Sequence, residues 1–235
     1  MKKTLIAALV STSLLASVPA FARQVSVEIT NLTNALYFTP LLVALHKPQQ
    51  HLFQVGEMAS DNLQAMAEGG NIAGLSLEVT DHGGRVVENP AGGLLGPGES
   101  TSADLQVKGR YRERLSITAM LLPTNDGFVG LDSLQIPRAH GTYTYYLQGY
   151  DAGTEANDEV INGGGAPGTP GIPADPGGNS GTGGTGIAGA DYNPRVHVHR
   201  GILGDHDPNG GASDLTASVH RFQNPVARLV IKVGK

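Results

Sequence analysis

Apolar and polar residues alternate along six short segments of the chain. In the first of them, Val25, Val27 and Ile29 are separated by single polar residues. The same alternation recurs in five more places, with apolar residues at Leu75, Leu77 and Val79; Leu115, Ile117, Ala119 and Leu121; Tyr143, Tyr145 and Leu147; Val196 and Val198; and Leu229, Ile231 and Val233. This period of two is typical of strands with one buried face, and Gly and Pro residues separate the segments. The pattern predicts an all-β fold, an antiparallel β-sandwich.

Only one segment has the signals of a helix. Ser60 is a good N-cap, residues 61–68 follow with few strand-favouring side chains, and Gly69 and Gly70 provide a stop. We therefore expect the sandwich to carry one short helix.

Residues 163–189 differ from the rest of the chain, because these 27 residues include 12 Gly and 4 Pro. With almost no apolar side chain to bury, such a segment does not offset its loss of conformational entropy on ordering. It is expected to be a flexible loop inserted between strands of a single domain over residues 23–235.

The N-terminal residues read as an export signal. Lys2 and Lys3 precede an apolar stretch, and Ala20-Phe21-Ala22 fits the small-x-small rule for cleavage, so residues 1–22 are predicted to be a signal peptide. The alternative is a retained membrane anchor, which the shortness of the apolar run disfavours. No other segment is long enough to cross a membrane, so the processed protein is expected in the periplasm or outside the cell.

The composition of the chain argues against several classes of function. The chain has no Cys, which excludes disulfides and thiolate chemistry, and its net charge of −5 is unfavourable for binding nucleic acid. Its 40% apolar content is sufficient for a core.

Two acidic loops follow predicted strands. Asp126 comes shortly after the strand that ends at Leu122, and Asp151 and Glu155 follow the next strand along the chain. Loops at strand ends can meet at one end of a sandwich, and crowded carboxylates suit a hard cation such as Ca²⁺. The other interpretation is ordinary turn chemistry, in which Asp and Gly are favoured without any ligand.

These two loops also carry a resemblance to a known family. The segments concerned are PTNDGFVGLDS at 123–133 and YDAGTEAND at 150–158, with VEITNLT at 27–33, FTP at 38–40, VALH at 43–46 and FQVG at 53–56 before them. In this order they resemble the spondin domain of F-spondin and mindin. The resemblance extends over most of residues 25–158.

The resemblance implies a sandwich like that of calcium-dependent lipid-binding modules, with one Ca²⁺ held by Asp126, Asp151 and Glu155. It also implies a secreted binding or adhesion module whose partner is an extracellular or cell-envelope protein or glycan. Two residues depart from the family pattern: Gly127 stands where animal members usually have Trp, and Glu155 replaces Asp. The disulfides of animal members are absent, and the Gly-rich segment has no counterpart in them.

Three histidines form a second candidate metal site. His197 and His199 are two residues apart on a predicted strand and project from one face, and His206 follows between Asp205 and Asp207. Together they could bind zinc or copper, in a metal-binding protein or a periplasmic or secreted metalloenzyme. The alternative is the polar, solvent-facing half of a strand. No catalytic motif is present, so we expect a protein that is not an enzyme; a purely structural envelope component is a third possibility.

Overall fold

The structure is a computed structural model that describes residues 22–108, 112–178, 181–187 and 193–234. Its strands are β1 (Ala22–Asn31), β2 (Tyr37–Phe38), β3 (Leu42–His46), β4 (Arg85–Glu88), β5 (Ser100–Lys108), β6 (Arg114–Leu122), β7 (Gly127–Gln135), β8 (Gly141–Asp151), β9 (His197–Val198) and β10 (Ala227–Val233). Its helices are α1 (Asp61–Gly69), α2 (Ala73–Asp81) and α3 (Ala217–His220). The predicted all-β class is confirmed, with more helix than the sequence pattern indicated.

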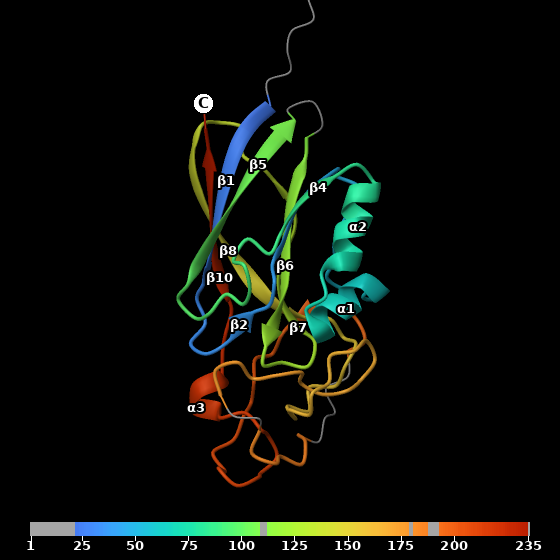
Figure 1. Cartoon of the computed structure of the whole chain (residues 1–235), viewed down its shortest axis with the longest axis vertical. Coiled ribbons are helices and arrows are strands. Elements are labelled where there is room, and N and C mark those ends of the chain that lie inside the picture. The colour runs from blue at the N-terminus through green and yellow to red at the C-terminus, as the bar shows by residue number, and fades with distance from the viewer. Residues whose placement is uncertain (1–21, 109–111, 179–180, 188–192, 235) are drawn as a thin grey trace, which may run out of the picture.

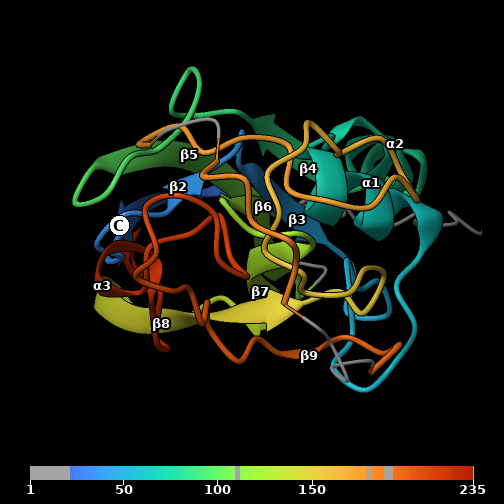
Figure 2. The ribbon, with the colours of Figure 1, turned by 90° about the horizontal axis from the view of Figure 1, so that it is seen from below.

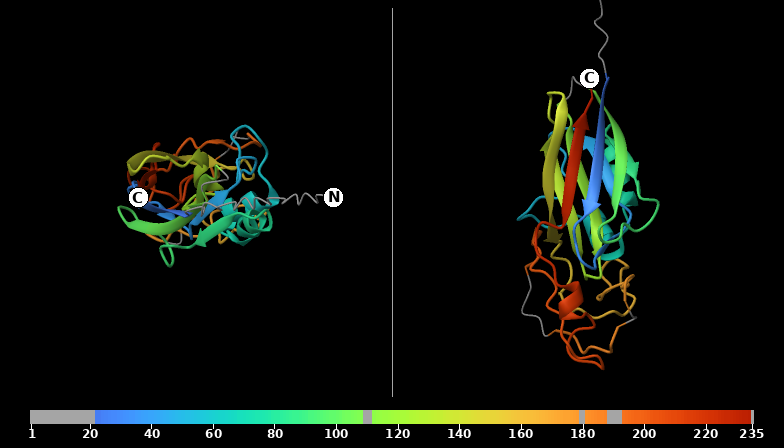
Figure 3. Two further views of the ribbon diagram at one scale, coloured as in Figure 1. Left: turned by 90° about the horizontal axis from the view of Figure 1, so that it is seen from above. Right: turned by 90° about the vertical axis from the view of Figure 1, so that its left-hand side faces the viewer.

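The strands form two layers that β8 joins. Their hydrogen-bonded order is β4-β3-β6-β7-β8-β10-β1-β5, with β2 paired to β6 and β9 paired to β8, and these pairings are antiparallel. The first part of β8 pairs with β10, and its last four residues, Gln148 to Asp151, pair with β7. Figure 3 (right) shows β8, β10, β1 and β5 side by side in one layer. The predicted antiparallel β-sandwich is thus confirmed.

Two apolar clusters hold the fold together. The larger lies between the layers and includes Val27 of β1, Ile117 of β6 and Ile231 of β10. The smaller lies on the outer face of β3, β6 and β7, where α1 and α2 cover it (Figure 2), and it includes Met66 and Phe128. Strands β3 and β6 are therefore buried on both faces.

The prediction of a strand around residues 75–79 is wrong, because this segment is helix α2. Leu75, Ser76 and Val79 are its buried residues, a spacing that corresponds to one face of a helix. Leu77, whose position suggested alternation, is 62% exposed. The helix packs against α1, β3 and β4, so its apolar face is satisfied without strand pairing. Together with α3, it corrects the expectation of one short helix.

Helix α1 forms where the sequence predicts it, with the predicted caps. The Ser60 hydroxyl accepts a hydrogen bond from the Leu63 N–H at 3.2 Å, and Gly70 ends the helix in the left-handed region at φ 69°. Both features satisfy backbone groups that a helix end otherwise leaves unpaired.

Replacing Ser60 with alanine is expected to lower the free energy of unfolding by about 1 kcal/mol, because the Leu63 N–H loses its acceptor. Urea denaturation of the two proteins measures the difference. A Ser60→Asp variant retains an acceptor and should stay close to wild type; an equal loss in both variants would contradict the capping role.

The loops after β8 gather at one end of the sandwich, and β1 begins and β10 ends at the other (Figure 1). The described part of the Gly-rich segment 163–189 contains no helix or strand. It does contribute a fully buried apolar side chain, Ile172, whose N–H donates to the Val160 carbonyl at 2.8 Å. The low apolar content of the segment did not indicate this contact.

The predicted signal peptide, residues 1–22, lies outside the described residues except for Ala22, at which β1 begins. Within the described part of the chain, no helix has the length and apolar character needed to cross a membrane.

Candidate metal site

Strand pairing brings Asp126 and Asp151 together. Asp126 immediately precedes β7, Asp151 ends β8, and the register of the two strands places Gly127 opposite Asp151. The Asp126 carbonyl accepts a hydrogen bond from the Ala152 N–H at 3.2 Å, which continues the pairing into the loops. The predicted meeting of these two acidic loops at a strand end is therefore present.

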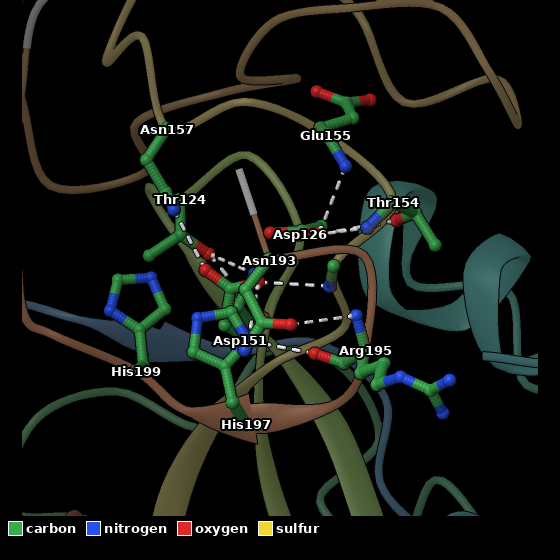
Figure 4. A network of polar contacts seen from close by, with 12 residues as sticks. Thr124, Asp126, Asp151, Thr154, Glu155, Asn157, Asn193, Arg195, His197 and His199 are labelled. Atoms are coloured by element: carbon green, nitrogen blue, oxygen red, sulfur yellow. Dashed lines mark hydrogen bonds and ion pairs between the residues drawn. The ribbon is translucent and has the colours of Figure 1, made fainter. Parts of the chain in front are cut away.

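The Asp126 side chain is fully buried and organises the second loop (Figure 4). Its Oδ2 accepts hydrogen bonds from the Thr154 N–H at 2.8 Å, the Glu155 N–H at 3.1 Å and the Thr154 hydroxyl at 3.2 Å. Its Oδ1 is buried and has no hydrogen-bond partner in the described part of the chain. Burial, followed by the negative charge of Asp151, raises the pKa of Asp126 to about 7.

Asp151 is buried beside it, with both carboxylate oxygens engaged. Oδ1 accepts the Gly153 N–H at 2.8 Å, and Oδ2 accepts the Asn157 side-chain amide at 2.7 Å. His197 approaches from β9, with its Nδ1 at 3.7 Å from Asp151 Oδ1. The Asn157 contact was not anticipated, although Asn157 lies within the acidic motif itself.

Glu155 contributes its backbone to this network, but its carboxylate points away from Asp126 (Figure 4). Glu155 Oε2 accepts the Gly171 N–H at 3.0 Å and the Asn125 side-chain amide at 3.4 Å, while Oε1 is buried and unpaired in the described residues. Burial is the main cause that raises the pKa of Glu155 to about 7, and the charge of Glu68 adds to it. The loop motif thus separates its three acids into a pair and a single carboxylate.

The donor set suits a hard cation better than a soft one. Asp126 and Asp151 offer carboxylate oxygens, and one of these, Asp126 Oδ1, is buried without a partner. Across the residues that the structure places, no three Asp, Glu, His or Cys side chains form a group able to hold a metal ion. A calcium ion at the pair would therefore need Glu155 to turn toward it, or oxygens from the backbone or water, to complete six to eight ligands.

His197 and His199 face inward, which differs from the solvent-facing alternative, whereas His206 is exposed. Val198 between them is 55% exposed, whereas His199 is buried against Phe222 with ring centroids 5.2 Å apart. His197 and His199 project from the same side of their segment, toward the acidic pair, as Figure 4 shows. His206 belongs to the Asp205–Asp207 loop and forms no three-residue metal group with them in the described structure.

Gly127 has a steric reason to lack a side chain. A Cβ at this position would lie 2.6 Å from the Thr124 hydroxyl oxygen and 3.0 Å from His199 Cδ2. The space beside the Gly127 backbone is thus occupied by His199, which explains how the fold accommodates glycine at this departure from the family pattern.

A third acidic loop lies elsewhere in the chain. Asp205, Asp207 and Asn209, followed by Gly210, have the spacing of the first half of an EF-hand calcium loop, but Thr216 stands at the twelfth position where that loop has Glu. Asp205 is engaged in backbone contacts instead, because it accepts the N–H groups of three residues further along the loop. These hydrogen bonds lower the pKa of Asp205.

The family profile of the spondin N-terminal domain (Spondin_N) matches residues 24–160, more than half of the chain. The chain belongs to the spondin N-terminal domain family. This spondin domain therefore includes both acidic loops. The Gly-rich segment and the candidate metal-binding residues His197, His199 and His206 lie beyond the match. A comparison with curated proteins found no match. Spondin domains are extracellular-type binding modules, and as a class they are not enzymes.

Proposed function

We propose that this spondin domain is an exported binding module that holds one Ca²⁺ ion at its loop end, through Asp126, Asp151 and Glu155. Residues 1–22 would act as the export signal, and the partner would be an extracellular or cell-envelope protein or glycan. The family supports a binding role, and the pair of buried carboxylates at the joined ends of β7 and β8 supports the cation.

The unpaired Asp126 Oδ1 is the observation that carries the calcium proposal. A buried carboxylate oxygen without a hydrogen bond is costly, and the negative charge of Asp151 beside it adds repulsion. A divalent cation would remove both penalties. Because Asp126 also accepts the N–H groups of Thr154 and Glu155, the ion would stabilise the second loop through the first.

Calcium is expected to raise the melting temperature of the purified protein relative to the same protein in chelator. At pH 7.5, above the pKa of about 7 of Asp126 and Glu155, these two carboxyl groups can ionise. An ion that binds only the folded state stabilises it by about 2.7 kcal/mol at one hundred times its Kd. Thermal melting with calcium and with EDTA, together with elemental analysis for one bound ion, tests this expectation.

Single variants locate the ion. Asp151→Asn should abolish most of the calcium-dependent shift, because it removes one charge of the pair. Asp207→Asn, in the loop with EF-hand-like spacing, is the matched control and should leave the shift unchanged. Equal melting temperatures with and without calcium, or loss of the shift only in Asp207→Asn, would overturn the assignment.

The same experiment separates the rival functions. Zinc or copper retained in place of calcium, and lost on replacing His197, would favour the transition-metal alternative, in which His199 and His206 also take part. A protein that retains no metal and shows no shift would favour a purely structural envelope component.

A further inference from the structure

A cavity lies at the end of the sandwich opposite the acidic pair. It has a volume of about 380 Å³ and lies between the start of β1, the end of β5 and the end of β7. Strand β7 runs from the acidic pair, where Asp126 precedes its first residue, to this cavity, which its last residue, Gln135, lines. The cavity and the proposed calcium site are therefore separate.

The floor of this cavity is apolar and its rim is basic. Val107 and Ile136 contribute buried apolar surface. The rim carries four cationic side chains, which are a quarter of the 16 Lys and Arg residues of the chain: Arg23, Lys108, Arg112 and Arg138. This concentration of positive charge is unexpected in a chain whose net charge is −5.

Among the described residues that line the cavity, the one carboxylate is already neutralised. Glu113 is buried and pairs with the Arg85 guanidinium at 2.9 Å, and it also accepts the backbone N–H of Lys108 at 2.7 Å. In the part of the chain that the structure describes, none of the four rim cations is ion-paired with a carboxylate. An anion bound in the cavity would relieve the repulsion between them.

Two features position the rim. The Arg23 guanidinium donates to the Arg138 carbonyl at 2.7 Å, so the first strand is tied to the segment after β7. Arg112 adopts a left-handed backbone conformation, with φ at 47°, which is uncommon for a residue other than glycine.

We propose that this basic cavity binds a small acidic saccharide, a sugar that carries sulfate or phosphate groups. Guanidinium groups match the geometry of these oxyanions, and the apolar floor suits the face of a sugar ring. The volume is within the range of small-ligand pockets, about 300–1,000 Å³. A concave cavity accommodates a discrete ligand better than it does the plane of a membrane.

Titration calorimetry with sucrose octasulfate tests the proposal, with uncharged sucrose, sodium sulfate and phosphatidylglycerol vesicles as comparison ligands. Sucrose octasulfate should bind the full-length protein in low salt and more weakly in 0.5 M NaCl, because the contacts are electrostatic. In a double variant, Arg112→Gln with Arg138→Gln, the Kd for sucrose octasulfate should rise at least about tenfold. EDTA should leave the binding unchanged, which distinguishes this site from the proposed calcium site.

The matched control removes two arginines at the other end of the molecule, Arg195→Gln with Arg221→Gln, and should bind like wild type. Equal affinity of wild type and the cavity variant would overturn the proposal. Binding of sodium sulfate as tight as that of sucrose octasulfate would show that no sugar is recognised. Binding of vesicles without binding of the saccharide would show a membrane surface instead.

Discussion

Replacing Phe128 with alanine is expected to lower the free energy of unfolding by about 3–5 kcal/mol. Phe128 is fully buried two residues after Asp126, in the smaller cluster on the face of β7 that α1 contacts. Its ring packs edge-on against Phe53, with centroids 5.0 Å apart, and lies 5.7 Å from the ring of Tyr150. Truncation would leave a cavity beside the two remaining rings, those of Phe53 and Tyr150, which the rigid strands around it cannot close. Urea denaturation monitored by circular dichroism measures the loss.

The matched control is Tyr146→Ala on β8, because Tyr146 is 58% exposed. Its loss should cost about 0.5 kcal/mol or less, as for other surface positions. A loss below 1 kcal/mol in Phe128→Ala would contradict the packing described for the smaller cluster.

The second large effect is a loss of stability of the calcium-free protein as pH rises from about 4 to about 7. Asp126 and Glu155 have pKa values of about 7 in the folded protein, above their ordinary values of 3.8 and 4.5. In this pH range the folded state retains protons that the unfolded state has released, so raising the pH favours unfolding. Each group contributes up to about 1.4 kcal/mol per pH unit, and the total loss should be a few kcal/mol.

An Asp126→Asn variant isolates this effect, because asparagine keeps an acceptor oxygen but cannot ionise. Stability measured in EDTA between pH 4 and 7.5 should fall more steeply in wild type than in the variant. Wild type must be compared with this variant because His46 also titrates in this range. Burial lowers the pKa of His46, so near pH 6.5 this group makes the free energy of unfolding rise with pH. Parallel pH profiles for the two proteins would show that Asp126 ionises normally.

The alternation of apolar residues predicted those strands that have one face in the core. β1, β6, β8 and β10 form where Val27, Ile117, Tyr145 and Ile231 indicated them. At β3 there is no alternation, because helices cover the second face of this strand and every residue in it is buried. At α2 the prediction is wrong. The exposed Leu77 completes an alternating pattern, so a strand is predicted where the chain forms a helix.

The candidate site was predictable in part for a physical reason. Asp126 and Asp151 flank two strands that pair with each other, so their proximity follows from the register once the strands are known. The direction of the Glu155 carboxylate depends on the Gly171 N–H, which belongs to a segment that has no repeating pattern. The inward turn of His199 depends on the absence of a side chain at Gly127, and a single sequence does not connect two positions so far apart.

The pairing of the first strand with the last has a mechanical consequence. β1 and β10 are antiparallel neighbours, with Val25 opposite Val233, so the start of one and the end of the other lie side by side. A force that pulls these two points apart loads the hydrogen bonds between the strands one after another, so they break in sequence at low force. A force between the loop end and either of these points would act along the strands and load many hydrogen bonds at once. The domain therefore resists tension best when it is held at one end and engaged at the other.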